Sequence, residues 1–255
     1  MRRGRHGQNR HLVSCVVLIG AFVALSACDR HSGRYFPLGE GVTRIYRQTV
    51  ITRNKGNAGA YSKSAYVTTS TNLPEQKIGD AEVAPQLYAD GTILYYRRTT
   101  EGVALVASRR RGDPAPAPIP PRFVIKYPVK LGATWHSDGR TEVLKRTFLG
   151  GFGSITKPVY VETPLAYKVE STDDTVHVGA GIFHHCLRIH GTGKGSMLWG
   201  GPNDSIGVSV DSVQWYAPKI GLVKEVRKEG TGPDGPLGGE LTEELAMVKR
   251  PGWFQ

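Results

Sequence analysis

The chain has 255 residues and a formal net charge of +11. This length suits one domain with a sizeable hydrophobic core. Only three cysteines occur, Cys15, Cys28 and Cys186, and the first two belong to the N-terminal segment described next, which excludes a scaffold held together by intramolecular disulfides.

Residues 1–27 have the three-part layout of a secretory signal peptide. A stretch with four arginines and no acidic residue is followed by an apolar run, Leu12 to Ala24, and then by small residues. The apolar run is too short for a comfortable membrane-spanning helix. We therefore expect the chain to be exported and residues 1–27 to be removed.

The signal peptide ends in Leu25-Ser26-Ala27-Cys28, which resembles the lipobox of bacterial lipoproteins. The resemblance implies that the thiol of Cys28 receives a diacylglycerol, that the chain is cut just before it, and that the new amino terminus takes a further acyl chain such as palmitate. Two or three acyl chains attach a protein lastingly to a bilayer, whereas one does not. The alternatives are an ordinary cleaved signal with a chance cysteine, or an uncleaved anchor.

Asp29 follows the lipidation site directly. In Gram-negative lipoproteins this resembles the sorting signal that retains a protein in the inner membrane, which implies a place in the bacterial cell envelope at the periplasmic face of that membrane. The alternative is a solvated acid at a flexible start. Residues 1–27 hold four of the 33 basic residues and none of the 22 acidic ones, so the remaining chain keeps a net charge of +7. That charge favours contact with anionic headgroups, and for an exported chain we expect no nucleic-acid partner.

The mature chain begins with a polar tether, residues 28–34, and continues as a single β-rich domain, residues 35–255. Runs of β-branched, aromatic and alternating residues separated by Gly, Pro, Asn and Asp predict strands. The predicted strands are Val42 to Thr52, Ala65 to Thr69, Thr92 to Arg98, Val103 to Ser108, Arg122 to Tyr127, Thr141 to Phe148, Leu165 to Ser171, Ile182 to Ile189, Gly207 to Tyr216, Leu222 to Lys228 and Glu240 to Val248. With little or no helix after the signal peptide, the pattern predicts an all-β fold, either an antiparallel sandwich or a curved half-barrel.

Two strand entries look alike. Tyr35-Phe36-Pro37-Leu38 and Tyr127-Pro128-Val129 each lead through a glycine into a strand, which suggests two related halves, residues 35–111 and 122–255, unless the likeness is chance. Between them, Arg109 to Pro121 has proline at almost every second place. Such a sequence predicts an extended polyproline spacer.

Two sequence motifs in residues 122–255 resemble those of uncharacterised all-β domains of the bacterial cell envelope. They are Val178-Gly179-Ala180-Gly181-Ile182-Phe183, leading into Cys186-Leu187, and Gln214-Trp215-Tyr216-Ala217-Pro218, leading into Gly221-Leu222-Val223-Lys224. The resemblance extends over about Tyr127 to Glu244. It departs at Lys219-Ile220, where the pattern has a glycine-containing turn.

Candidate chemistry centres on the cluster His177, His184, His185 and His190, with Cys186 among them. On a regular strand, His184, Cys186 and His190 share a face and would meet a metal with Asp173 or Asp174, but Arg188 lies between them and repels a cation. We expect a polar strand face with a half-buried thiol, no metal and no cofactor.

Gly191 to Ser196 lacks the strand-to-helix setting of a phosphate loop and predicts a flexible hairpin turn. No nucleophile elbow is present, and we expect no enzymatic activity.

The predicted lipid anchor and the predicted all-β fold together favour a non-catalytic, lipid-anchored periplasmic binding module. Antiparallel half-barrels with open mouths commonly hold apolar molecules, so an apolar or envelope ligand is expected. The alternative is a structural or assembly lipoprotein that contacts an envelope protein complex. The two differ in that a carrier has a cavity and an assembly protein an exposed apolar patch.

Overall fold

The computed structural model describes residues 33–54, 60–144, 160–198, 205–232 and 237–252. The chain divides into two compact units, Met1–His31 and Ser32–Gln255, and the fold below is that of the second unit. The signal peptide, Cys28 and Asp29 lie outside the described residues, so the lipobox and the sorting signal stay predictions.

The described part of the chain is all-β, as predicted. Its strands are β1 (Thr43–Asn54), β2 (Ala60–Asn72), β3 (Gln76–Ile78), β4 (Ala81–Tyr88), β5 (Ile93–Thr99), β6 (Gly102–Arg109), β7 (Ala117–Lys126), β8 (Thr134–Ser137), β9 (Leu165–Val178), β10 (Gly181–Leu198), β11 (Ser205–Ala217), β12 (Gly221–Gly230) and β13 (Leu237–Lys249).

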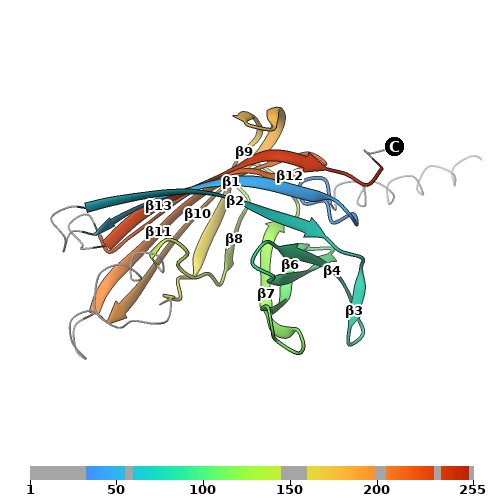
Figure 1. Ribbon diagram of the computed structural model, residues 1–255, viewed down its shortest axis with the longest axis horizontal. Coiled ribbons are helices and arrows are strands. Elements are labelled where there is room, and N and C mark those ends of the chain that lie inside the picture. Colours follow the sequence, from blue (N-terminus) through green and yellow to red (C-terminus); the bar gives the residue numbers. More distant parts are fainter. Residues whose placement is uncertain (1–32, 55–59, 145–159, 199–204, 233–236, 253–255) are drawn as a thin grey trace, which may run out of the picture. The chain divides into compact units, whose positions relative to one another are not determined.

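All the strands join one antiparallel sheet with the order β7-β6-β5-β4-β2-β1-β13-β12-β11-β10-β9-β8, and β3 pairs only with β4. The first and the last strand are therefore neighbours at the middle of the sheet, where Thr43 lies opposite Lys249. Strands β1 to β7 form one side of this pair and β8 to β13 the other. In Figure 1, β4 to β7 turn downward from β2, on the same side of the sheet as β8.

The sheet curves until its two edge strands, β7 and β8, come together. The indole Nε1 of Trp135 in β8 donates a hydrogen bond to the carbonyl oxygen of Phe123 in β7, at 3.1 Å. A buried cluster also joins the edges, because Ile125 of β7 packs with Trp135 and with Val169 of β9. The fold is therefore the curved half-barrel of the two predicted alternatives, not the sandwich.

Three strands were missed by the sequence analysis: β3, β4 and β8. Strand β4 carries Pro85 near its centre, a residue that normally argues against an interior strand. Its neighbour β5 places Tyr95 opposite Pro85, and the carbonyl of Pro85 accepts the N–H of Leu73. Pro85 lies between the part of β4 that pairs with β2, up to Gln86, and the part that pairs with β3, from Val83, so the N–H that proline lacks falls in the gap between these two pairings.

Three predictions about local structure were wrong. Gly191 to Ser196 is not a hairpin turn but the second half of the long strand β10. Thr141 to Leu144 forms no strand, and the rest of the strand predicted there, up to Phe148, lies outside the described residues. Ala117 to Pro121, the end of the proline-rich segment, belongs to β7 and pairs with β6, where Pro118 lies opposite Ala107.

The alternating glycines of β10 explain why that segment is extended. A Cβ atom on Gly193 would lie 2.6 Å from the carbonyl oxygen of Pro164, and one on Gly195 would lie 2.7 Å from that of Glu162. Glycine is thus required because the backbone before β9 approaches β10 closely, not because the chain reverses.

Candidate functional site

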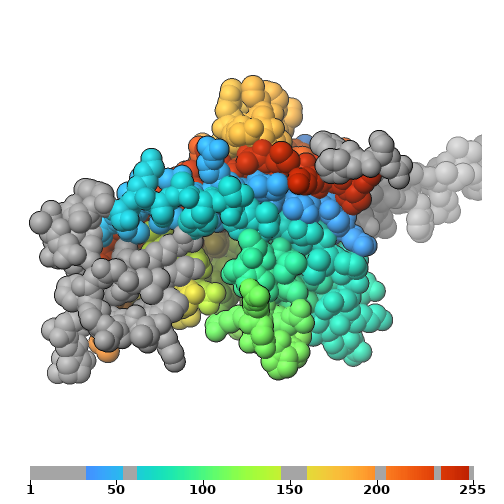
Figure 2. Space-filling view, viewed as in Figure 1, coloured from blue at the N-terminus to red at the C-terminus, as the bar shows by residue number. Residues whose placement is uncertain are grey.

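The concave side of the sheet holds a cavity of about 360 Å³. Its walls come from both sides of the central strand pair: β1, β2, β4 and β5 on one side, and β11, β12 and β13 on the other. Figure 2 shows the surface hollowed below the blue and cyan of β1 and β2, beside the green of β6 and β7. A cavity of this size suits a small molecule.

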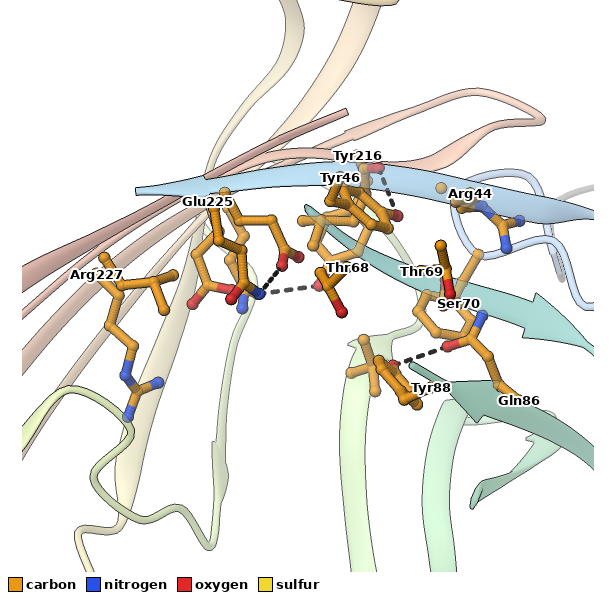
Figure 3. Close-up of a pocket in the computed structure, with 18 of the residues that line it drawn as sticks. Arg44, Tyr46, Thr68, Thr69, Ser70, Gln86, Tyr88, Tyr216, Glu225 and Arg227 are labelled. Carbon is orange, nitrogen blue, oxygen red and sulfur yellow. Dashed lines mark hydrogen bonds between the residues drawn. The ribbon is translucent and has the colours of Figure 1, made fainter. Parts of the chain in front are cut away.

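The cavity walls follow from strand periodicity. On β1, Arg44, Tyr46 and Gln48 alternate along the strand and all face the cavity, and on β12 Glu225 and Arg227 do the same. Cross-strand pairing brings further polar groups beside them, since Gln48 lies opposite Glu243. Figure 3 shows Tyr46, Glu225 and Arg227 among the side chains that line this space.

Four tyrosines, Tyr46, Tyr88, Tyr96 and Tyr216, give the cavity its aromatic surface. Three of them use their hydroxyl hydrogen within the protein: Tyr46 donates to the carbonyl of Leu222 at 3.1 Å, and Tyr88 and Tyr216 donate to the amide oxygens of Gln86 and Gln214 at 2.8 and 3.0 Å. Burial raises the pKa of all four phenols, that of Tyr96 to about 12. They are neutral at physiological pH, and the phenol oxygens remain acceptors.

One end of the cavity is formed by Arg44, which is 3% exposed. Its Nε donates to the carbonyl of Ile220 at 2.6 Å, and its two terminal nitrogens donate to the Asn72 side-chain oxygen at 3.2 Å and the Pro37 carbonyl at 3.0 Å. Burial lowers its pKa from the usual value of 12.5. A hydrogen bond of 2.9 Å from Gln86 to the same Asn72 oxygen links this end to the tyrosines.

The other end carries the carboxylate of Glu225 together with Arg227, and the carboxylate of Glu243 lies within electrostatic reach of Tyr46 and Tyr88. Glu225 accepts the hydroxyl of Ser212 at 2.9 Å, and Glu243 accepts the side-chain amide of Gln48. Burial opposes the charged form of Arg227, but Glu225 and the buried Glu229 outweigh it and raise the pKa of the guanidinium. Figure 3 shows Arg44 on one side of the cavity and Glu225 and Arg227 on the opposite side.

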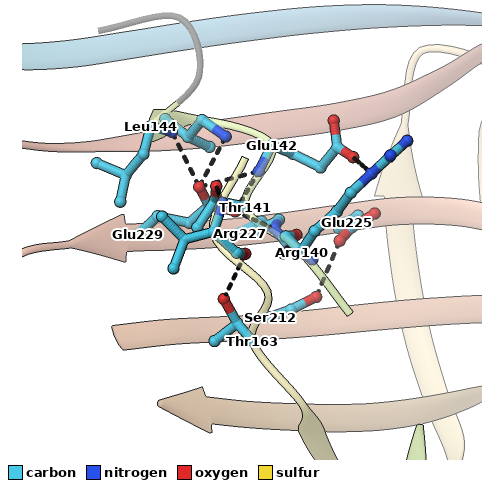
Figure 4. Close-up of polar contacts among 11 residues, drawn as sticks. Arg140, Thr141, Glu142, Leu144, Thr163, Ser212, Glu225, Arg227 and Glu229 are labelled. Atoms are coloured by element: carbon cyan, nitrogen blue, oxygen red, sulfur yellow. Dashed lines mark hydrogen bonds and ion pairs between the residues drawn. The ribbon is translucent and has the colours of Figure 1, made fainter. Parts of the chain in front are cut away.

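Behind this end, Glu229 holds a loop in place. Its fully buried carboxylate accepts the backbone N–H groups of Glu142, Val143 and Leu144 at 2.8 to 3.0 Å, and the Nε of Arg227 at 2.5 Å. Figure 4 shows the loop bound over the strand by these contacts. The same loop brings Glu142 to the cavity wall.

The predicted histidine cluster lies away from this cavity. His184 contacts Thr175 at 3.1 Å, and His185 contacts Asp173 at 2.5 Å on the exposed β9–β10 hairpin. His190 bridges Asp211 at 2.9 Å and Glu170 at 3.0 Å; the bond to Asp211 and then that to Glu170 raise its pKa, against the effect of burial. Within the described ranges, no three His, Cys, Asp or Glu side chains are grouped as for a metal ion.

The expected sharing of one strand face by His184, Cys186 and His190 was wrong. The pairing of β9 with β10 shifts between Phe183 and Cys186 and again before Ile189, and His185 has a positive φ of 55°. These irregularities break the period of two, so that Cys186 and Leu187 are both 0% exposed. Cys186 is a buried thiol, not the half-buried one that was predicted.

Sequence reasoning missed every residue of the cavity. A readable signal exists, because Arg44-Tyr46-Gln48 and Glu225-Arg227-Glu229 are polar rows at a spacing of two on strands that were predicted. Such rows usually mark the solvent face of a strand. The curvature of the sheet, which turns that face inward, is not visible in the pattern.

Comparison with known proteins gives two solved structures. A protein described as exported, with a YmcC-like fold, from Bacteroides fragilis is 14% identical, with a TM-score of 0.38 over 85% of this chain and 99% of that one. A protein described as a lipoprotein, from Parabacteroides distasonis, is 10% identical, with a TM-score of 0.34 over 85% of this chain and 98% of that one. No protein-family model and no curated protein matches the sequence. A search of the described residues for a helix long and apolar enough to cross a membrane found none.

Proposed function

We propose that this chain is a lipid-anchored binding module of the bacterial envelope, that its ligand occupies the concave cavity, and that binding involves no covalent chemistry. The observation that carries the proposal is the cavity itself, about 360 Å³ in volume, with tyrosines and fixed polar groups on its walls. Hydrogen bonds within the wall hold these groups in position before a ligand arrives. Such a preformed site loses little conformational entropy on binding.

The lining favours a hydrophilic ligand over an apolar one. An acyl chain in this cavity would cover Glu225, Arg227 and Gln214 without offering them hydrogen bonds, which is costly for buried polar groups. A molecule with hydroxyl or amino groups would instead donate to the phenol and carboxylate oxygens. The faces of Phe36 and the tyrosines would contact its carbon skeleton.

The location of the module rests on its sequence. Lipidation of Cys28 would anchor the chain, and Asp29 would keep it at the periplasmic face of the inner membrane. The tether of residues 28–34 spans at most about 25 Å when extended, which would hold the cavity close to the bilayer. Separation of the inner and outer membranes by density, followed by immunodetection of the chain, tests this placement.

Native mass spectrometry of the lipidated mature protein, released from micelles, tests the proposed function. We expect a noncovalent added mass of a small hydrophilic molecule that leaves on unfolding. The variant Thr68→Trp, which places an indole in the cavity, should lose this mass. The matched control is Val67→Trp, because Val67 is the adjacent residue of β2, is 65% exposed and faces away from the cavity.

The outcomes separate the alternatives. An added mass in the wild type and in Val67→Trp, but not in Thr68→Trp, supports the cavity as the binding site. An added mass that matches a free fatty acid or phospholipid and is lost in Thr68→Trp would contradict a hydrophilic ligand. Equal added masses in both variants would place the ligand elsewhere.

An assembly lipoprotein is the second candidate, and one observation favours it. Met247 of β13 is 50% exposed and lies opposite Ile45 of β1. On the other side of Ile45 lies Thr69 of β2, and the exposed Val67 is two residues before Thr69 on that strand. These apolar side chains share the outer face of the central strands. If a protein partner binds there, Met247→Asp should abolish its recovery after crosslinking in cells, and Thr68→Trp should not.

A further inference from the structure

The guanidinium of Arg44 is a buried positive charge with no acidic partner in the described part of the chain. The ion pairs found there involve other basic residues, and the three acceptors of Arg44 are two backbone carbonyls and one amide oxygen. Buried arginines are normally paired with a carboxylate, because removal of a charge from water is expensive. Neutral acceptors compensate this cost only in part.

The hydrogen bonds of Arg44 are also incomplete. A guanidinium has five N–H groups, and the three bonds above use one on each nitrogen. One N–H on each terminal nitrogen therefore has no acceptor among the described residues. A carboxylate or phosphate oxygen is the acceptor to which a guanidinium N–H binds most strongly.

The surroundings of Arg44 are arranged for a negative charge. Arg250 is near enough to lower the pKa of Arg44 further, so a second cation adds to the positive potential. Gly221, at a φ of 100°, lets the backbone come close to the guanidinium, because a Cβ there would lie 3.3 Å from the Nε of Arg44. The nearby phenols of Tyr46, Tyr88 and Tyr96 are neutral and do not compete as anions.

The opposite end of the cavity differs because its one cation, Arg227, is paired within the protein with the buried Glu229. Glu225 lies there, and a carboxylate repels an anion but accepts hydrogen bonds from hydroxyl and amino groups. A ligand with both kinds of group would thus have one favoured direction in the cavity. Figure 3 shows this separation of Arg44 from Glu225.

We propose that Arg44 binds an anionic group of the cavity ligand, a carboxylate or a phosphate, while the hydroxyl or amino groups of the same molecule face Glu225. The inference rests on the proposed function and narrows the ligand to a small hydrophilic anion. It predicts that a polyhydroxylated acid binds more tightly than the neutral polyol of the same length.

The test is titration of the lipidated mature protein in micelles with sodium gluconate, with inorganic phosphate and, as the neutral comparison, with sorbitol, at constant ionic strength. Calorimetry gives the affinities, and the side-chain N–H signals of Arg44 give the contact in ¹⁵N-labelled protein. Gluconate or phosphate should shift these signals and bind at least about tenfold more tightly than sorbitol. A preference for phosphate over gluconate would identify the anionic group.

Arg44→Gln removes the charge and Arg44→Lys keeps it without the planar fork. Both should weaken anion binding, Arg44→Gln more than Arg44→Lys, with sorbitol binding unchanged. Arg47→Gln is the matched control, since Arg47 lies on the same strand, is exposed and faces away from the cavity. The Arg44 signals of the wild type provide a readout that does not depend on the folding of the Arg44 variants.

Three results would overturn the inference. Absence of any shift of the Arg44 signals by either anion would show that the guanidinium takes no anionic ligand. Equal anion affinity in Arg44→Gln and in the wild type would show that anions bind without the guanidinium of Arg44. Binding of sorbitol that Thr68→Trp abolishes, without anion binding, would leave the proposed function intact while removing this inference.

Discussion

At the scale of the residue, Cys186 combines complete burial with a raised pKa. Burial, followed by the charge of Asp174, raises the pKa of its thiol to about 11, and the thiol contacts the carbonyl oxygen of Phe183 at 3.5 Å. At pH 8 only about one thiol in a thousand would be ionised, and the thiolate is the reactive form. Burial therefore makes the thiol unreactive in two ways, since it keeps reagents away from the sulfur and raises the pKa of the thiol.

We predict that the folded mature protein does not react with a thiol reagent such as iodoacetamide at pH 8, and that the denatured protein takes up one equivalent. Mass spectrometry measures both. Cys186→Ser should show no uptake in either state if Cys28 is lipidated. Fast labelling of the folded wild type that Cys186→Ser abolishes would contradict the burial of Cys186, and labelling that persists in Cys186→Ser would reveal a free thiol at Cys28.

At the scale of the element, Glu229 on strand β12 determines where the loop of residues 141–144 lies. Its carboxylate is the acceptor for three successive backbone N–H groups of this loop and for Arg227. Without the carboxylate, buried donors and a buried guanidinium would lose their partner together. Such a loss costs more than the removal of an exposed ion pair.

Glu229→Ala should lower the free energy of unfolding by about 3 to 5 kcal/mol, measured by urea titration. The control is Glu240→Ala on β13, because Glu240 is partly exposed and its ion pair with Lys228 is long, at 3.9 Å. This control should cost less than about 1 kcal/mol. Similar losses in the two variants would mean that the buried carboxylate does not anchor the loop.

At the scale of the whole molecule, Trp135 joins the two ends of the sheet. Trp135→Phe removes the indole N–H that binds the carbonyl of Phe123 but keeps a ring to stack on Tyr167, whose centroid lies 5.3 Å away. We expect a loss of about 0.5 to 1.5 kcal/mol in stability and faster hydrogen exchange of the β7 amides.

The control for this prediction is Trp215→Phe, which also removes one indole hydrogen bond, the one to Asp174 at 3.0 Å. That bond does not join the two edges of the sheet. Its stability should fall by a similar amount, whereas exchange in β7 should stay as in the wild type. If β7 exchanges at the wild-type rate in Trp135→Phe, the edges do not depend on this contact.

The sequence predicted most strands because β-branched and aromatic runs are local signals, as in β1, β11 and β12. It misplaced Gly191 to Ser196, because glycine favours a turn locally while here it makes room for the backbone of Glu162 and Pro164. The cavity could not be predicted either, because it too depends on contacts between distant parts of the chain. Arg44 and Glu225 are far apart in the chain, and only the closure of the sheet makes their faces one surface.

The pairing of β1 with β13 has a consequence for the order in which the chain folds. The first strand gains its second neighbour only when the last strand is available, so the contacts at the middle of the sheet have very high sequence separation. Such topologies fold slowly, because loop closure over a long stretch precedes the favourable contacts. A chain that crosses the inner membrane from its amino terminus would therefore complete the sheet, and with it the cavity, only after its final strand has emerged.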